Sequence, residues 1–304
     1  MKKLSGLIAA PFTPMNSTGD VDYERIGDYY KLLVRNGCRG AFINGSTGEG
    51  VSLMVDERMK VAEAWASCKN DQDALRVINL VGGTSWRECA ALARHSATIG
   101  IDAVAVLAPY YFKPAGVESL AEFIELIGKE VPDLPLYFYH IPVLTGVNIP
   151  MISLLERLSD RLPNFMGIKY THEDFMDYQS CLAFDSGRYD LLWGRDENML
   201  AALALGAKGA VGSTYNYAAP LYNQLIRAFN DGNLLQARQL QQQSIDMIRL
   251  LGKYGGIATG KAFMRYIGFE CGAFRSPVRN MSRSDYQRFS ADVAQLDMEN
   301  LFSR

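Results

Sequence analysis

Cysteine and histidine are scarce in this chain of 304 residues, which has five of the first and three of the second. The cysteines are odd in number, widely separated and without a Cys-x-x-Cys pair, so they indicate neither a disulfide framework nor a zinc site. We expect reduced, buried thiols at Cys38, Cys68, Cys89, Cys181 and Cys271. The three histidines lack the i,i+4 spacing of a helical metal site, and the sequence therefore implies no metal.

Long hydrophobic runs and an excess of one charge are also missing. Every apolar stretch is interrupted by charge before the roughly 18 residues that a membrane helix needs. Residues 1–10 imitate a signal peptide, but their apolar part stops at Pro11, and we expect a cytoplasmic protein without a membrane segment. The 31 basic against 33 acidic residues give a formal net charge of −2, with no basic run, so a nucleic-acid partner is not expected.

What the sequence does contain is an alternation of short apolar β-rich runs with amphipathic helical segments. We predict strands at 7–10, 40–44, 77–82, 103–108, 136–140, 167–170, 191–193 and 210–212. Helical periodicity follows at, for example, 22–36, 56–68, 85–99, 117–129 and 197–205, and later at 221–230, 234–251, 260–269 and after Ser282. Eight β-then-α units favour an α/β fold, a (β/α)8 TIM barrel, over an open sheet. We expect one domain, 1–304, with the barrel at 4–231 and a C-terminal helical extension at 232–304.

In such barrels the reacting groups lie where strands end and in the loops that follow. The strand ends here carry hydroxyls, one amine and a carboxylate pair. The clearest candidate for a reacting group is Lys169, which follows the apolar run 165–168. Either this lysine reaches solvent or a neighbouring acid, or burial among Tyr139, Phe138 and Ile168 lowers its pKa and makes it a Schiff-base nucleophile. It is the one lysine that we expect to point at the site.

The other strand ends allow two readings each. The loop 45–50 lacks a GxGxxG or Walker spacing, and it is either a plain turn with a Ser/Thr helix cap or a carboxylate clamp made by Ser46 and Thr47. Tyr139 is a core aromatic or, at its strand end, a proton shuttle. Of Tyr110 and Tyr111 at most one should reach the site, because neighbours face opposite ways.

A carboxylate pair, Asp196 and Glu197, follows the seventh strand. At a helix start it could serve only the helix dipole, with Arg195 neutralising it. Facing a barrel mouth, the pair could instead accept hydrogen bonds from a polyhydroxylated ligand. His140 and His172 are expected to be structural.

Taken together, these stretches resemble the superfamily of N-acetylneuraminate lyases and dihydrodipicolinate synthases, and the lyase branch most closely. The resemblance runs over 4–269. The motifs that carry it are Gly-Ser-Thr-Gly-Glu-Gly at 45–50, Tyr-His-Ile-Pro at 139–142, Thr-Gly at 145–146, Gly-Ile-Lys-Tyr-Thr at 167–171, Gly-Arg-Asp-Glu at 194–197 and Gly-Ser-Thr-Tyr-Asn at 212–216.

The resemblance implies a class I aldolase that cleaves N-acetylneuraminate, a sialic acid, reversibly into N-acetylmannosamine and pyruvate. Lys169 would form the imine, with no further cofactor, and Tyr139 would move the proton of the C4 hydroxyl. The implied substrate-binding residues are Ser46, Thr47, Thr171, Gly194, Asp196, Glu197 and Ser213. Tyr111 matches a family tyrosine near a subunit interface, and the family is usually a homotetramer.

Two features favour the lyase branch over the synthases. Synthases carry an arginine shortly after the Tyr-x-x-Pro motif, where this chain has Val-Leu-Thr at 143–145, and they tend to lack the acidic pair. Arg195 departs from the lyase pattern and bears on substrate preference. Two alternatives stay open: another pyruvate-dependent enzyme, acting on a 2-keto-3-deoxy sugar acid or as a dihydrodipicolinate synthase, or a non-catalytic barrel that binds sugar acids.

Overall fold

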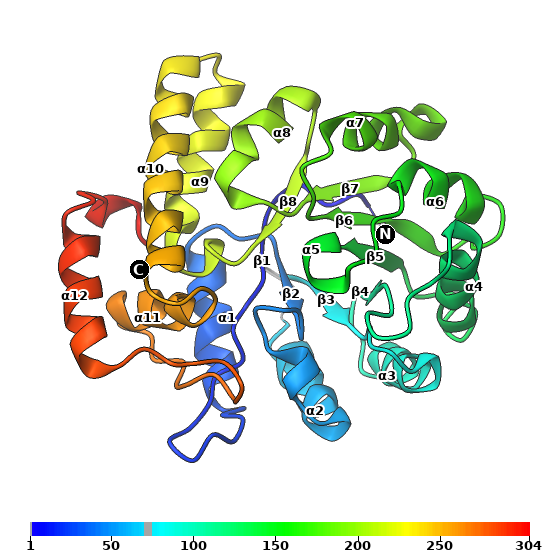
Figure 1. Cartoon of the computed structure of the whole chain (residues 1–304), viewed down its shortest axis with the longest axis horizontal. Coiled ribbons are helices and arrows are strands. Elements are labelled where there is room, and N and C mark those ends of the chain that lie inside the picture. The colour runs from blue at the N-terminus through cyan, green and yellow to red at the C-terminus, as the bar shows by residue number, and fades with distance from the viewer. Residues whose placement is uncertain (1, 70–74) are drawn as a thin grey trace.

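Eight parallel strands close into a barrel in the computed structural model, which describes residues 2–69 and 75–304 (Figure 1). Each strand pairs with its neighbour in the chain, and β1 pairs with β8 to close the ring. The strands are β1 Gly6–Ala9, β2 Gly40–Ile43, β3 Arg76–Leu80, β4 Ala103–Leu107, β5 Leu136–His140, β6 Phe165–Tyr170, β7 Asp190–Trp193 and β8 Gly209–Gly212. The predicted TIM barrel is confirmed, and each predicted strand overlaps the observed one to within two residues at either end.

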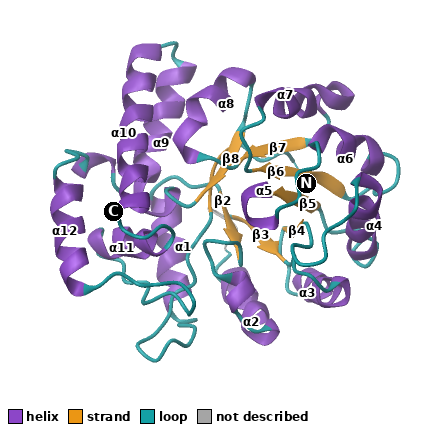
Figure 2. Ribbon diagram, viewed as in Figure 1, coloured by secondary structure: helices purple, strands orange, loops and turns teal. Residues whose placement is uncertain are grey.

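Helices surround this ring, as the purple elements of Figure 2 show. The helices of the βα units are α1 Arg25–Arg35, α2 Val55–Ser67, α3 Trp86–Thr98, α4 Val117–Gly128, α5 Pro142–Thr145, α6 Met151–Leu158, α7 Phe175–Ala183, α8 Met199–Leu205 and α9 Tyr215–Asn230. The four-residue helix α5 was not predicted, because a single turn is too short to show periodicity.

Helix α9 begins six residues earlier than the predicted start at residue 221. Pro220 lies inside it, and two residues before the proline the backbone at Ala218 departs from helical values, with φ −138° and ψ 30°. Proline lacks the N–H of a helix interior, so it suggests a helix boundary. Here it marks a kink that the helix tolerates.

Side chains of the strands alternate between two apolar layers. The interior of the barrel is filled by one buried cluster that includes Ile8, Phe42, Tyr137 and Tyr139. Their neighbours in the chain, such as Phe138, belong to the larger cluster between strands and helices. This alternation follows from the two-residue period of a strand. It decides which strand residues can reach a site inside the barrel.

Three further helices pack beside the barrel: α10 Leu234–Lys253, α11 Ala258–Tyr266 and α12 Arg283–Ala294. Figure 1 shows α10 running along α9, with α11 and α12 on the same side of the molecule. The ring of Phe263 stacks on Tyr217 of α9 at 4.5 Å between centroids and meets Phe289 of α12 edge-on at 4.8 Å. These aromatic contacts join α12 to α11 and α11 to α9.

The cysteines are all free thiols. Four are buried as predicted, while Cys68 is only half-buried. Across 2–69 and 75–304, no helix has both the length and the apolar character needed to cross a membrane.

Candidate active site

Lys169 lies near the C-terminal end of β6 and points into the barrel, where it is only 4% exposed. Its Nζ sits 4.0 Å from the centroid of the Phe42 ring and 3.8 Å from that of Tyr139. Burial lowers the pKa of this ammonium to about 7, and the negative charge of Asp196 only partly opposes the shift. A substantial part of the amine is therefore neutral, and so nucleophilic, at neutral pH.

The walls of this pocket differ from the prediction in two residues. Tyr139 does face Lys169, but Phe138 and Ile168 belong to the outer cluster and point away from it. The reason is the alternation of strand side chains: each of the two is the immediate neighbour of a residue that faces inward. Phe42 from β2, on the other side of the barrel, takes their place.

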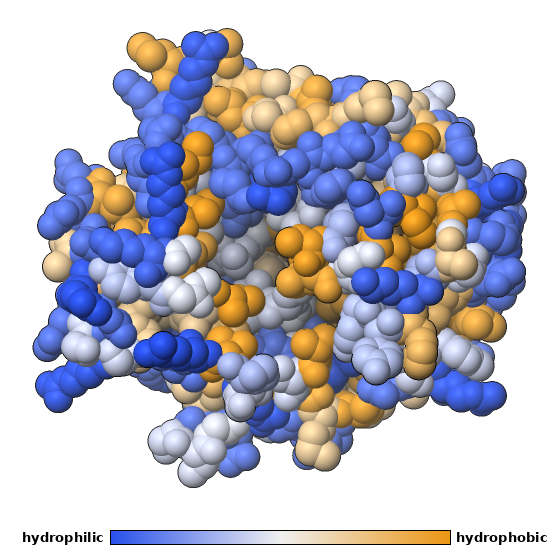
Figure 3. All heavy atoms as spheres, in the orientation of Figure 1, coloured by the Kyte–Doolittle hydropathy of each residue, from blue (hydrophilic) through white to orange (hydrophobic). Residues whose placement is uncertain are grey.

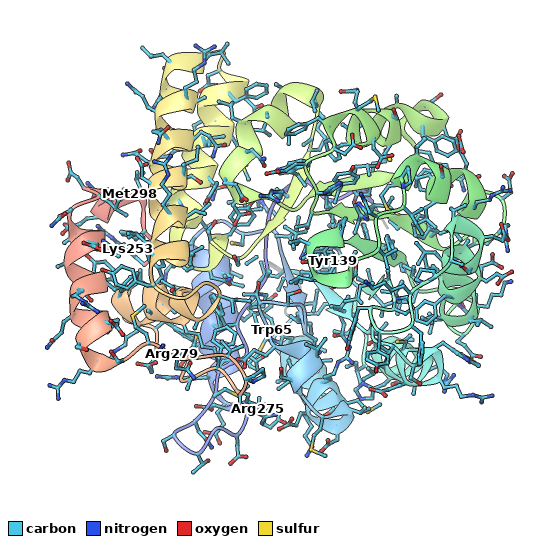
Figure 4. The ribbon with its side chains drawn as sticks, viewed as in Figure 1. Trp65, Tyr139, Lys253, Arg275, Arg279 and Met298 are labelled. Atoms are coloured by element: carbon cyan, nitrogen blue, oxygen red, sulfur yellow. The ribbon has the colours of Figure 1, made fainter. Side chains whose placement is uncertain are left out.

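Tyr139 is buried at the end of β5, and its ring meets Phe42 edge-on at 5.5 Å. Burial raises the pKa of the phenol to about 12, and the hydroxyls of Ser46 and Thr171 partly oppose the rise. The side chain of Tyr139 is labelled at the centre of the barrel in Figure 4. The phenol is therefore protonated at neutral pH and lies between a strand-end lysine and two hydroxyls.

The loop 45–50 follows β2 in a tight conformation. Asn44 and Glu49 both have positive φ, 55° and 58°, which is uncommon for residues other than glycine. Gly50 is required beside them, because a Cβ there would overlap the carbonyl oxygen of Asn44. The hydroxyl of Thr13 donates to the Gly48 carbonyl at 2.6 Å. The loop holds Thr47 buried at the mouth and leaves the neighbouring Ser46 half-buried.

Asp196 is buried beneath the mouth, in the turn Asp196–Asn198 that follows β7. The Thr214 hydroxyl and backbone N–H donate to its Oδ2 at 2.6 and 3.1 Å, while within the described residues its buried Oδ1 has no hydrogen-bond partner. Burial raises the pKa of this carboxyl to about 6, helped by the nearby charge of Glu197. The Tyr215 phenol also acts on this carboxyl and lowers its pKa, so Oδ1 lacks only a hydrogen bond of ordinary geometry among the described residues.

Arg195 forms an ion pair with one of the two acids of the turn, Glu197. Its guanidinium lies 2.6 Å from Glu197 and 2.8 Å from Glu173, which is in the loop after β6. Its backbone carbonyl accepts a hydrogen bond from the Trp193 indole at 2.7 Å. The cation is therefore shared between two carboxylates, and Glu197 is held at the rim, half-exposed.

Three other predicted residues come from the same edge of the barrel. Thr171 follows β6, and its Oγ1 is buried without a hydrogen bond of ordinary geometry to any described residue. Gly194 follows β7, and a Cβ there would overlap that same Oγ1. Ser213 follows β8 and is half-buried. The close approach at Gly194 explains why this position has no side chain.

A cavity of about 400 Å³ opens beside Ser46 at the mouth. Figure 3 shows a hollow at the centre of this face with hydrophobic side chains on its rim. Tyr110 lines the cavity, whereas Tyr111 is 78% exposed and does not line it. The remaining lining residues are Glu49, Val51, Ser52, Leu107, Ile141, Leu144, Thr145, Ile257, Phe274 and Val278.

Sequence reasoning missed the part of the mouth that comes from the C-terminal helices. Lys261 falls in the predicted helical segment 260–269 and was not expected to point at the site, but its ammonium reaches the side chain of Glu49 in the loop 45–50. Phe274 and Val278 line the cavity. The available signal was weak: small residues, Gly260 and Ala262, flank this lysine, and Phe263 and Met264 follow it.

The closed parallel barrel with a desolvated lysine at a strand end defines a lysine-dependent barrel enzyme. A family model, the dihydrodipicolinate synthetase family, matches residues 3–296. This chain belongs to that family.

Three N-acetylneuraminate lyases are similar to this chain over nearly its whole length. N-acetylneuraminate lyase from Rattus norvegicus is 40% identical over 308 residues, covering 99% of this chain and 94% of the relative. The structure of N-acetylneuraminate lyase from Proteus mirabilis superposes with a TM-score of 0.94 at 40% identity, covering 97% of this chain and 99% of the other. That of the sialic acid aldolase from Aliivibrio salmonicida gives a TM-score of 0.94 at 38% identity, with 98% of each chain covered.

Proposed function

We propose that this protein is a class I aldolase that cleaves N-acetylneuraminate reversibly to N-acetylmannosamine and pyruvate. The observation that carries the proposal is Lys169, an amine buried at a strand end whose pKa is lowered to about 7. At pH 7.4 about 70% of such an amine is neutral, against about 0.1% of an exposed lysine. The relatives named above support the choice of substrate.

The reaction begins when the Lys169 amine adds to the C2 ketone of the open-chain sugar acid and water leaves. The resulting iminium is the electron sink that the reaction needs, so no metal or other cofactor is part of this proposal. As the C4 hydroxyl loses its proton, the C3–C4 bond breaks and its electrons enter the iminium. N-acetylmannosamine departs, C3 of the enamine takes up a proton, and water releases pyruvate and the free lysine.

Tyr139 is suited to carry the proton from the C4 hydroxyl. Because the pKa of its phenol is about 12, it is a poor free base at neutral pH and acts by passing its own proton on as it accepts another. The substrate carboxylate, held by Ser46 and Thr47, is a proton acceptor close to this phenol. The hydroxyls of Ser46 and Thr171 already act on the phenol in this structure.

The polyol end of the substrate would lie toward the turn after β7. Asp196 offers a buried carboxylate oxygen that makes no hydrogen bond of ordinary geometry to the described residues, and Glu197 offers a carboxylate held by Arg195. Thr171, Gly194 and Ser213 surround the same edge. Carboxylates of this kind accept hydrogen bonds from hydroxyls and repel an anionic tail.

The residues that follow β5 give less support to the alternative of a dihydrodipicolinate synthase. The segment after β5 forms α5, in which Val143 and Leu144 are 78% and 62% exposed. Neither can bind the carboxylate of an anionic aldehyde, and a neutral sugar is the better partner.

We also propose a cytoplasmic homotetramer, for which Tyr111, 78% exposed in the single chain, is a contact residue.

The experiment is a comparison of pyruvate release from N-acetylneuraminate and from a 2-keto-3-deoxy sugar acid by the purified protein. We expect kcat/KM to favour N-acetylneuraminate. A preference for the shorter sugar acid would overturn the substrate assignment while leaving a pyruvate-releasing aldolase. Binding of both compounds without pyruvate release would favour the non-catalytic barrel.

A further inference from the structure

The most deeply buried ion pair of the mouth joins the C-terminal helices to the loop 45–50. Lys261 of α11 and Glu49 lie 2.8 Å apart, with side chains 4% and 3% exposed. Neither residue has a part in the reaction described above. Burying two charges is costly unless their geometry is good and their remaining hydrogen bonds are satisfied, so such a pair calls for an explanation.

Both charges are fully engaged. The Lys261 ammonium also donates to the Ala273 carbonyl at 2.9 Å and lies 4.6 Å from the centroid of the Phe274 ring. The second carboxylate oxygen of Glu49 accepts the backbone N–H of Arg275 at 2.7 Å. A single carboxylate therefore ties α11 and the segment 273–275 to the loop.

The loop end of this tether is the part that carries Ser46 and Thr47. The Glu49 backbone N–H donates to the Ser46 carbonyl at 3.2 Å, and its left-handed backbone, with φ 58°, turns the side chain toward α11. A movement of Glu49 thus moves the turn that begins at Ser46. The position of the two hydroxyls depends on where the carboxylate is anchored.

The C-terminal end of the tether is held independently. The Arg275 guanidinium makes two bonds of 2.6 Å to the Glu57 carboxylate of α2. Figure 4 shows Arg275 where the C-terminal segment passes beside α2. Gly260 lets α11 press against Phe12, since a Cβ at that position would overlap the ring. The C-terminal end of the tether is therefore fixed to α2 and to Phe12 by contacts that do not involve the loop 45–50.

We infer that Lys261 and Glu49 are positioning residues for the 2-oxo acid end of the substrate. The buried ion pair holds the loop 45–50 at the place where Ser46 and Thr47 clamp the substrate carboxylate. The inference rests on the proposed function, because it needs a carboxylate bound at that clamp. On this inference the C-terminal extension helps to position the substrate-binding loop, although none of its residues takes part in the reaction.

The test uses the full-length double variant Glu49→Gln/Lys261→Met. Removing both charges together leaves no unpaired buried charge, so the fold is expected to survive where a single Lys261→Met change could fail. The readout is the pyruvate concentration that gives half-maximal borohydride trapping on Lys169. We expect it to rise about tenfold, less than the roughly 100-fold that a 1 Å misplacement can cost. Maximal labelling is expected to stay unchanged.

Glu125→Gln is the matched control. Glu125 is also a buried carboxylate, paired with Lys129 at 2.6 Å and Arg161 at 2.7 Å, but it lies on α4 outside the barrel. It should lower the melting temperature without changing half-saturation. An unchanged half-saturation in the folded double variant would overturn the inference and leave the proposed function standing. Absence of trapping in the wild type would instead overturn the proposed function and the inference with it.

Discussion

At the scale of single residues, the chemistry depends on removing one lysine from water. A lysine in water or beside a carboxylate keeps a high pKa, but Lys169 is buried and faces two aromatic rings. Desolvation dominates over the attraction of Asp196, and the pKa falls to about 7. The ordinary side chain thereby becomes a nucleophile without help from a neighbouring base.

This balance predicts how imine trapping depends on pH. The rate of borohydride trapping with pyruvate should rise with pH around a midpoint of about 7, because only the neutral Lys169 amine attacks. Asp196→Asn removes the charge that stabilises the ammonium, so its midpoint should lie lower. Trapping rates measured from pH 5 to 10 check both curves. A wild-type midpoint near 10 would contradict the desolvation argument.

At the scale of elements, the site is made by strand ends that approach one another closely. Gly194, after β7, leaves the space that the Thr171 hydroxyl occupies. Such a contact between neighbouring βα loops helps to set the shape of the mouth. Even one methyl group added at Gly194 would disturb this contact.

Gly194→Ala should therefore lower kcat/KM for N-acetylneuraminate by at least about tenfold, since the new methyl group displaces Thr171 from the substrate pocket. Steady-state kinetics measure the effect. The control is Gly27→Ala in α1, where an added Cβ meets nothing within 4 Å. That change should leave kinetics unaltered and stabilise the fold by about 0.5–1 kcal/mol. Equal kinetics for the two variants would show that the space beside Gly194 is not needed.

The elements themselves were largely readable from the sequence. Apolar residues that recur every two or every 3.6 residues predict the strands and the helices. Because reacting groups of such barrels lie at the C-terminal ends of strands, the predicted strands then place Lys169, Tyr139 and Asp196 at one mouth of the barrel. Inward or outward direction was less readable: Phe138 was expected beside the lysine and lies outside the barrel. Its neighbour Tyr139 faces inward, so the same alternation that predicts a strand excludes both from one pocket.

At the scale of the whole molecule, contacts distant in the sequence were beyond prediction. Glu49 and Lys261 are 212 positions apart, and nothing local to either indicates the other. The C-terminal helices were expected as an extension, but their share in the mouth follows from how α11 packs on the barrel. Tertiary contacts of this kind require the folded structure.

The aromatic cluster around Phe263 should set how firmly those helices are attached. Phe263→Ala removes a fully buried ring that contacts α9 and α12, and it should lower the free energy of unfolding by about 3–5 kcal/mol. Urea unfolding followed by circular dichroism measures this loss. Phe112→Ala, at a position that is 85% exposed, should change stability little. Equal losses for the two variants would contradict this account of the attachment.

The proposed reaction requires that Lys169 form an imine during cleavage of N-acetylneuraminate. The most direct measurement treats the protein with N-acetylneuraminate and borohydride, follows pyruvate release in parallel, and locates the added mass, with folded Lys169→Ala under identical conditions. The account predicts pyruvate from the wild type alone and the mass of a reduced pyruvate imine on Lys169. Pyruvate release by the alanine variant, or cleavage by the wild type with no adduct on Lys169, would contradict it.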